Sequence, residues 1–261
     1  DAVVVDFFIP HDIRFKMLEK IDVDYVLCST NQYILSDNKG IIIEGAENDD
    51  VEGLEFKPDA AKEGRILFFT ATQDECDKAV VLTTENILSA IFNISSRCRC
   101  GENDRVLAQI ELSNVFGFVY SLMWPLGTGA CVCVGRGLRH IDSDAYYYNP
   151  TILPANPSLA EYLKKIKGFN SELRSIIIGG APCPYHLYEA LRDRDINVCT
   201  VYGSAEGTGC IAVNYAEDGA YEPFEDGTIT LSDDGEILLK GSCVMSGYDN
   251  DKAATDEKLR D

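Results

Sequence analysis

Short apolar runs of strand length alternate along this chain with amphipathic stretches of helical spacing, and this alternation restricts its fold more than any other feature. Apolar residues recur every three or four positions in the stretches between the runs. Strand–helix–strand alternation is typical of layered, largely parallel sheets with flanking helices, so we predict an α/β fold. The expected strands are residues 2–6, 25–28, 40–44, 66–70, 79–82, 105–109, 130–134, 175–178, 198–201 and 210–214, and the expected helices are 13–21, 86–96, 115–124, 158–166 and 185–192.

Two regions depart from this alternation. Residues 45–64 are acidic, contain glycine and show no periodicity, which indicates a surface loop. Near the end, Asp233-Asp234-Gly235 separates the runs 227–231 and 236–240, and an Asp-Gly turn between two such runs predicts a β-hairpin. We therefore expect α/β subdomains over residues 1–220 and the start of a small antiparallel β subdomain over residues 221–261.

The charge balance narrows the possible partners. The 261 residues include 23 basic and 43 acidic side chains, a formal net charge of -20. Nucleic acids and anionic membranes favour clusters of Lys and Arg, which are missing here, so we expect no nucleic-acid partner. No apolar stretch approaches the ~20 residues that cross a bilayer, and no signal peptide is evident. We expect no membrane span and a cytoplasmic protein.

The cysteines and histidines suggest structural roles. Ten cysteines include the pairs Cys98/Cys100 and Cys131/Cys133, and neither pair has the Cys-x-x-Cys spacing of zinc ribbons. Cys131 and Cys133 lie in an apolar run, where a reduced thiol behaves as a small hydrophobic group, so we expect reduced core thiols rather than a metal site. His11, His140 and His186 are scattered, and we expect them at the surface or at helix caps.

The run from Phe69 to Asn86 lies between an apolar strand and an amphipathic helix, where a phosphate-gripping loop can form. By register it resembles the signature loop of the adenylate-forming (AMP-binding) superfamily, Tyr-Thr-Ser-Gly-Thr-Thr-Gly-x-Pro-Lys-Gly, followed downstream by Thr-His-x-Asn. Thr70, Lys78 and Asn86 match this pattern. The resemblance implies that Thr70 binds nucleotide and that Lys78 is catalytic.

Two further segments resemble nucleotide-binding motifs of the same family. Gly179-Gly180-Ala181-Pro182 is similar to the family's Gly-Gly-Ala-Pro turn, which lies along the adenine. A glycine pair lets a flat base approach the backbone, although a tight strand-to-helix turn would also explain it. Tyr202-Gly203-Ser204-Ala205-Glu206 resembles Tyr-Gly-x-Thr-Glu, in which the Tyr stacks on adenine, the Thr meets the α-phosphate and the Glu reaches Mg²⁺. The plain alternative for Glu206 is an ordinary loop acid.

Two longer segments complete the resemblance. Gly235-Glu236-Ile237, Gly241 and Val244-Met245-Ser246-Gly247-Tyr248-x-Asn250 are similar to the family's late motif Gly-Glu-Ile…Gly-x-x-Val-Met-x-Gly-Tyr-x-Asn. Residues 111–117, before Pro125-Leu126 and Gly129-Ala130, resemble the family's aromatic/His segment. By this resemblance Asn114, Phe116 and Gly117 line the acyl pocket, with Asn114 at a position that is usually His.

The resemblance covers nearly the whole chain and implies the large N-terminal domain of an acyl-CoA-synthetase-like enzyme. The family's reaction joins a carboxylic acid to ATP, giving acyl-adenylate and pyrophosphate, and then transfers the acyl group to CoA or a carrier thiol. The implied cofactors are ATP or AMP with Mg²⁺ at Glu206, and fatty acid metabolism is one implied setting. The GRG-like stretch 135–137 favours the acyl-CoA synthetase branch. We expect truncation at both ends, without the mobile C-terminal domain.

Substitutions concentrate at the positions that face the nucleotide. Ala205 lacks the hydroxyl of the family's Thr, and Thr84 stands in place of the downstream His. In the loop, the glycines, hydroxyl residues and proline of the pattern are replaced by Ala71, Thr72, Gln73, Asp74, Glu75 and Asp77. Three carboxylates therefore stand near the phosphate positions, and like charges ~5 Å apart repel by about 1–3 kcal/mol per pair. We predict a degenerate phosphate loop.

Two hypotheses follow from this loop. The first is a ligase with a divergent loop, in which an added metal ion bridges the acids. The second is a pseudoenzyme, a non-catalytic relative that binds an acyl group, a nucleotide or a partner, with the loop a solvated acidic turn. The loop chemistry favours a protein that is impaired or inactive in ATP use, whereas the overall resemblance favours an acid–thiol ligase.

Overall fold

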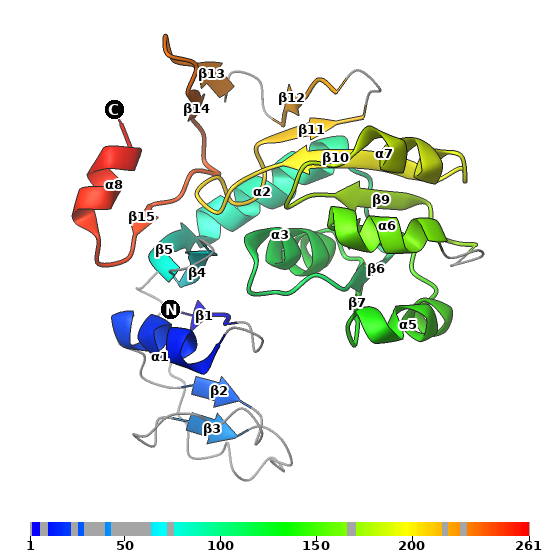
Figure 1. Cartoon of the computed structure of the whole chain (residues 1–261), viewed down its shortest axis with the longest axis horizontal. Coiled ribbons are helices and arrows are strands. Elements are labelled where there is room, and N and C mark those ends of the chain that lie inside the picture. Colours follow the sequence, from blue (N-terminus) through cyan, green and yellow to red (C-terminus); the bar gives the residue numbers. More distant parts are fainter. Residues whose placement is uncertain are drawn as a thin grey trace. The chain divides into compact units, whose positions relative to one another are not determined.

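The computed structural model describes residues 2–5, 10–21, 26–28, 40–42, 64–71, 76–165, 171–215, 219–224 and 229–260. Contacts divide the chain into unit 1, Asp1–Val81 with Gly247–Asp261, and unit 2, Leu82–Ser246. Helices and strands alternate in both (Figure 1), and the predicted mixed α/β class is confirmed. The expected subdivision at residue 220 is a different partition of the chain and stays a prediction.

Unit 2 is built on a seven-stranded sheet with the strand order β12-β11-β10-β9-β8-β6-β7. Its first five strands in chain order pair in parallel, and the last two are antiparallel additions at one edge. The strands are β6 Arg105–Ala108, β7 Cys131–Val134, β8 Ile152–Ala155, β9 Ser175–Ile178, β10 Asn197–Tyr202, β11 Ala212–Asn214 and β12 Glu222–Pro223. Strands β8 and β9 are buried along their whole length, which makes them the core of this unit.

Helix α2, Thr84–Arg97, precedes the first of these strands, and the other helices of unit 2 lie in the connections between them. The latter are α3 Val115–Phe118, the π-helix η3 Val119–Met123, α4 Trp124–Gly127, the 3₁₀ turn η4 Leu138–His140, α5 Ile141–Tyr148, α6 Pro157–Lys165 and α7 Tyr185–Arg192. The chain moves from β6 to β7 on one side and then returns past β6 to β8. Because such crossovers are right-handed, α3–α4 belong to one face of the sheet and α5–α7 to the other. This reversal makes the carboxyl ends of the parallel strands the expected ligand edge.

Local chemistry explains how two of these helices are placed. Helix α2 begins with a capping box, in which Asn86 N–H donates to Thr83 Oγ1 at 3.2 Å and Thr83 N–H donates to Asn86 Oδ1 at 2.8 Å. The segment α3–η3–α4 widens to a π-helix just before Pro125, whose ring nitrogen has no hydrogen to donate. There Trp124 N–H bonds to Val119 O, five residues back.

Among its described residues, unit 1 contains a four-stranded sheet of order β1-β4-β5-β15, a two-stranded sheet β2-β3, and two helices. The elements are β1 Ala2–Val3, α1 His11–Lys20, β2 Val26–Cys28, β3 Gly40–Ile42, β4 Arg65–Ala71, β5 Cys76–Thr83, β15 Gly247–Tyr248 and α8 Lys252–Lys258. Leu67, Ala79 and Val81 form its small core. Strand β5 is the element through which the chain passes from unit 1 into unit 2.

The expected elements are confirmed where the structure describes them, with small shifts at their ends. The predicted hairpin is present as β13 Ile229–Leu231 and β14 Ile237–Leu239, with Gly235 at φ +85° in the turn. Strand β8 was not predicted, because Pro154 interrupts its apolar run and proline is rare in central strands. Its pairing with β6 is limited to Val106 and Ile152, in keeping with a residue that cannot donate to the ladder.

The exposure of the cysteines and histidines can be compared with what the sequence predicted. Cys133 is buried, but Cys131 is exposed, so the prediction that both are core thiols was wrong for Cys131, which is the first residue of β7, a strand at the edge of the sheet. His140 and His186 are exposed, as expected. The predicted loop at residues 45–64 lies outside the described residues except for Gly64. Over the described part of the chain, no helix is long and apolar enough to span a bilayer.

Candidate functional site

The nucleotide-binding candidates of unit 2 gather at the carboxyl ends of β9 and β10. Strand β9 ends at Ile178 and leads directly into the Gly179–Pro182 turn, and β10 ends with Tyr202, which opens the second motif. The two strands are adjacent and parallel, so both turns emerge at the same edge of the sheet. Gly180, Ala181, Pro182, Gly203 and Ser204 are exposed there. This edge offers open backbone to a ligand.

Gly179 is held against an aromatic ring of the acyl-pocket segment. A Cβ built at Gly179 would lie 2.6 Å from Phe116 Cε2 and 2.8 Å from Val201 Cγ2, closer than real Cβ contacts allow. Phe116 is itself buried, with 6% of its surface exposed. The structure therefore brings the adenine-type turn and the acyl-pocket segment into direct contact, and only glycine fits between them.

The second motif folds back on a glycine-rich stretch that follows it. A Cβ at Gly203 would lie 2.4 Å from the carbonyl of Gly209, and Gly209 adopts a left-handed φ of +69°. Between them, Thr208 is fully buried with φ 53°, an unusual conformation for a β-branched residue. Its hydroxyl donates to the Cys243 carbonyl at 2.6 Å. Strained backbone of this kind persists where the surroundings hold it, often at functional sites.

The late motif anchors this loop from behind. Met245 N–H donates to the Glu206 carbonyl at 2.8 Å. The amide of Asn86 donates to the carbonyls of Ser242 and Val244, each at 2.8 Å. Three segments that the sequence analysis singled out separately are thus joined by hydrogen bonds within unit 2.

Two tyrosines and one carboxylate complete this edge. The ring of Tyr202 is 45% exposed and meets Tyr221 edge-to-face, with centroids 6.3 Å apart. Glu206 is half-buried, whereas Ala205 offers no hydroxyl. No group of three or more His, Cys, Asp or Glu side chains suited to a metal occurs among the described residues. Mg²⁺ commonly takes one or two protein carboxylates plus substrate phosphates, so Glu206 fits a metal that arrives with a nucleotide.

The other acyl-pocket candidates have structural partners. Asn114 is exposed, and its side chain caps α3 by accepting the Phe116 N–H at 2.8 Å. A Cβ at Gly117 would lie 2.3 Å from the Glu111 carbonyl, so the turn before α3 requires glycine here. The acyl-pocket role of Asn114, Phe116 and Gly117 stays a prediction.

The GRG-like stretch holds an ion pair between the exposed Arg136 and the buried Asp144 at the carboxyl end of β7. Asp144 is 1% exposed, and it accepts the Arg136 N–H at 2.8 Å and the Arg136 Nε–H at 2.7 Å. Gln109 adds a longer bond at 3.3 Å. Burial raises the pKa of Asp144, but the bonds from Arg136 and Gln109 together outweigh it and hold that pKa below its usual value.

Thr70 and Lys78 belong to unit 1. The Thr70 hydroxyl donates to the Lys78 carbonyl across strands β4 and β5, at 3.3 Å. The Lys78 ammonium lies over the Tyr248 ring, 5.1 Å from its centroid, in a cation–π contact. Residues 72–75 of the acidic loop, with Asp74 and Glu75, lie outside the described residues.

The family that these features point to is shown by comparison with known proteins. A family model described as AMP-binding enzyme matches residues 77–249. The chain belongs to this AMP-binding enzyme family. The resemblance drawn from the motifs is thereby confirmed, and the domain is of the adenylate-forming, acyl-CoA-synthetase-like kind.

Relatives and solved structures agree with this assignment. An indenyl-substituted propanoyl:CoA ligase of Mycobacterium tuberculosis is 30% identical over 210 residues, covering 72% of this chain and 40% of the relative. The 4-coumarate–CoA ligase-like 4 of Oryza sativa subsp. japonica is 26% identical over 221 residues, covering 74% and 40%. This chain therefore spans about 40% of the length of either relative.

Two solved structures show the same fold at low identity. The N-terminal domain of FACL13 from Mycobacterium tuberculosis aligns with a TM-score of 0.83 at 17% identity, covering 99% of this chain and 74% of that one. The O-succinylbenzoate Coenzyme A synthetase MenE from Bacillus subtilis, in complex with ATP and magnesium ion, aligns with a TM-score of 0.81 at 18% identity, covering 99% and 59%.

Sequence reasoning missed three residues at this edge. Tyr221 contacts Tyr202, although the two residues are 19 positions apart in the sequence, and no local pattern predicts such a contact. Thr208 and Gly209 could have been found, because the Gly207-Thr208-Gly209 run signals unusual backbone.

Proposed function

We propose that this chain is the adenylate-binding part of an acyl-CoA-synthetase-type protein whose use of ATP is impaired. Its ligand would be AMP or an acyl-adenylate, its acid substrate a carboxylic acid such as a fatty acid, and its acceptor CoA or a carrier thiol. The names of the relatives, which are CoA ligases, support this class. The observation that carries the proposal is the packing of Gly179 and Gly203, where no Cβ fits, beside an exposed Tyr202.

The adenine end of the site supports retained binding. A flat base needs open backbone on one side and an aromatic face on the other. Gly180, at φ +81° with no heavy atom within 4 Å of a built Cβ, leaves such space, and Tyr202 offers the ring. These features fit a nucleoside, and Glu206 would hold the Mg²⁺ of a nucleotide beside it.

The phosphate end supports impaired use of ATP. Asp74, Glu75 and Asp77 add negative charge along the loop that would meet the β- and γ-phosphates. Ala205 has no hydroxyl for the α-phosphate. AMP carries less charge and has no β- or γ-phosphate, so the acidic loop should penalise it less than ATP.

A direct test is to neutralise the loop. The triple variant Asp74→Asn, Glu75→Gln, Asp77→Asn should bind Mg-ATP at least about tenfold more tightly, since each tenfold requires about 1.4 kcal/mol. Its affinity for AMP should change little. A matched control neutralises three exposed acids elsewhere, Asp142, Asp193 and Asp233, and makes the same change in net charge. Equal gains in both variants, or wild-type binding of Mg-ATP as tight as AMP, would contradict the proposal.

A non-catalytic role is a second candidate, favoured by the placement of Lys78. The Lys78 ammonium makes a cation–π contact with the Tyr248 ring of the same unit, which is a structural role. Lys78→Ala should then destabilise unit 1 and leave the binding of AMP and Mg-ATP unchanged. If Lys78 instead serves the nucleotide, Lys78→Ala should weaken Mg-ATP binding with AMP as the unaffected control.

A further inference from the structure

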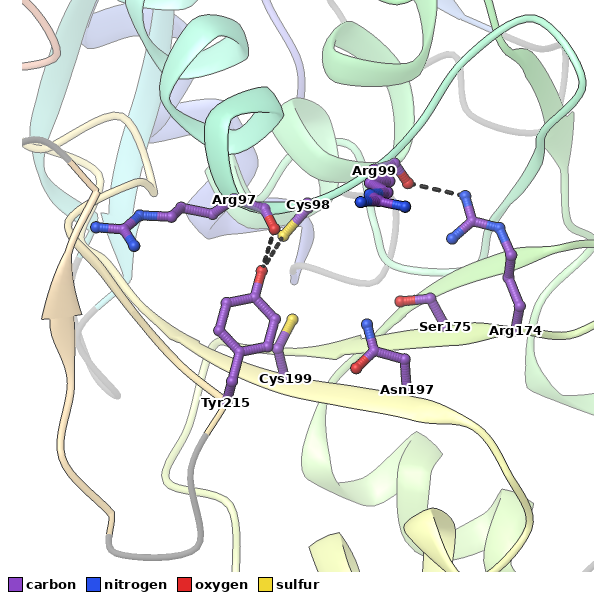
Figure 2. Close-up of a pocket in the computed structure, with 8 residues that line it drawn as sticks. All are labelled: Arg97, Cys98, Arg99, Arg174, Ser175, Asn197, Cys199 and Tyr215. Carbon is purple, nitrogen blue, oxygen red and sulfur yellow. Dashed lines mark hydrogen bonds between the residues drawn. The ribbon is translucent and has the colours of Figure 1, made fainter.

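A pocket in unit 2 lies at the opposite edge of the sheet from the glycine turns. It has a volume of about 150 Å³ and is formed by the first residues of β9 and β10, Ser175 and Asn197, beside the end of α2. Three arginines, Arg97, Arg99 and Arg174, also line it (Figure 2). None of these residues belongs to the candidate adenylate site, so neither site depends on the other.

The charge of this pocket is opposite to that of the chain as a whole. The chain has 23 basic and 43 acidic side chains, yet no acid occurs among the described residues that line the pocket. Arg97 is directed away from it in Figure 2, and its Nη1 lies 3.2 Å from Glu222 Oε2. Arg174 Nη2 lies 2.8 Å from Asp104 Oδ2. Arg99 has no acidic partner in the described part of the chain, so its positive charge is uncompensated.

The Ser175 hydroxyl is a buried polar group that faces the pocket. Ser175 is 7% exposed, and a buried hydroxyl is normally hydrogen-bonded. Its backbone N–H donates to the Thr151 carbonyl at 3.2 Å, but its hydroxyl has no partner among the described residues. In Figure 2 this hydroxyl and the Asn197 amide point into the space below Arg99. A ligand in that space would supply the missing hydrogen bond.

The groups available to a ligand here are hydrogen-bond donors. Arg99 offers its guanidinium, Asn197 its amide NH₂ and Ser175 its hydroxyl. Arg174 donates from Nε and Nη2 to Asp104 and to the Arg99 carbonyl, which leaves its Nη1 without a partner among the described residues. A planar carboxylate is matched by the fork of one arginine. Donors from several segments of the chain suit the tetrahedral oxygens of a phosphate group better.

We propose that this pocket binds a phosphate group, either as the free ion or as the end of a phosphate monoester. Arg99 supplies the positive charge, and Ser175 and Asn197 donate hydrogen bonds to the phosphate oxygens. The size agrees, because a water molecule takes up about 30 Å³ of liquid and about 150 Å³ therefore holds a phosphate and a few waters. The bound group would join the end of α2 to the starts of β9 and β10.

Calorimetric titration of the wild-type chain with sodium phosphate, at constant ionic strength, tests this site. We expect saturable binding with a Kd below about 10 mM, unchanged by AMP, and binding of acetate at least about tenfold weaker. Glycerol 3-phosphate is the second arm: if it binds more tightly than phosphate, the ligand is a monoester, and if it binds more weakly, the ligand is the free ion. Absence of saturation, acetate as tight as phosphate, or displacement of phosphate by AMP would overturn the proposal.

Three variants locate the binding. Arg99→Gln should weaken phosphate at least about tenfold, because a charge-assisted hydrogen bond is lost, and Ser175→Ala about two- to tenfold. Arg139→Gln is the matched control, since it removes one positive charge from an exposed arginine on η4, and it should leave the affinity unchanged. Equal losses in the two arginine variants would show a general effect of charge and contradict the proposal. Because Ser175 is buried and its replacement can disturb β9, the exposed Arg99 decides the outcome.

Discussion

The contact between Gly179 and Phe116 yields the sharpest prediction about how the site is built. Gly179 does not adopt a positive φ, so an alanine there meets only a steric obstacle. Its Cβ would lie 2.6 Å from the Phe116 ring and 2.8 Å from Val201, and something must move. Overpacking of this kind costs about 1–3 kcal/mol, and the lower entropy of the unfolded chain returns about 0.4–1 kcal/mol. We expect Gly179→Ala to destabilise unit 2 by about 1–2 kcal/mol.

A double-mutant cycle isolates the cause. Phe116→Leu removes the ring edge that the new methyl group meets, so Gly179→Ala should cost at least about 1 kcal/mol less in that background. Gly180→Ala is the matched control, because its cost comes from φ +81° in otherwise open space and should not depend on Phe116.

The assay uses the single tryptophan of the chain. Trp124 is fully buried in unit 2. The centroid of its ring lies 6.4 Å from that of Tyr120, and the Tyr120 centroid lies 4.8 Å from that of Phe116. Its fluorescence during urea unfolding reports the unit that carries the contact. If the effects of Gly179→Ala and Phe116→Leu add within about 0.3 kcal/mol, the packing argument is refuted.

Three other changes test separate parts of the account. Asn86→Ala removes the capping box and both amide bonds to the late motif, so unit 2 should lose about 2–3 kcal/mol in the same Trp124 assay; a loss below about 0.5 kcal/mol would contradict this. The pKa of Asp144 in the folded state is lower than its usual value. The ionised carboxylate therefore adds to the free energy of unfolding above about pH 4, and this contribution is lost as the pH falls through the folded-state pKa. Asp144→Asn should therefore lower stability at pH 7 by about 1–3 kcal/mol and flatten the acid limb, which urea titrations at pH 7 and pH 3 would show. Ala205→Thr restores a hydroxyl and should tighten AMP about three- to tenfold without changing the affinity for adenosine, as calorimetry can measure.

Local sequence patterns carried most of the fold. The Asp-Gly turn predicted the hairpin of β13 and β14. Apolar runs predicted the parallel strands, because a strand that is buried on both faces has an uninterrupted apolar sequence. Strand β8 was not predicted because it contains Pro154. A proline has no N–H to donate, so a central strand tolerates it only where the adjacent strand does not need that hydrogen bond. Helix α5 was not predicted for a different reason. Its aromatic residues Tyr146 and Tyr147 are 90% and 79% exposed, so apolar residues occur on both sides of the helix and the sequence lacks a clear amphipathic pattern.

The site was predictable to the extent that it is made of contiguous motifs. The glycine turn and the Tyr202 segment are local, and they lie together because β9 and β10 are adjacent. The roles of Phe116 as the partner of Gly179 and of Tyr221 as the partner of Tyr202 depend on contacts between distant parts of the chain. Such contacts leave no spacing to recognise. The acyl group that the family's relatives bind differs from protein to protein and has no motif of its own.

Calorimetric titration of this chain with AMP, an unreactive acyl-adenylate mimic and Mg-ATP tests the central claim most directly. The claim is that the adenylate end of the site is retained while the acidic loop opposes the outer phosphates of ATP. The account predicts that AMP and the mimic bind and that Mg-ATP binds at least about tenfold more weakly than AMP. Mg-ATP binding as tight as AMP would show that Asp74, Glu75 and Asp77 do not oppose the phosphates, and the reading of this loop would be wrong.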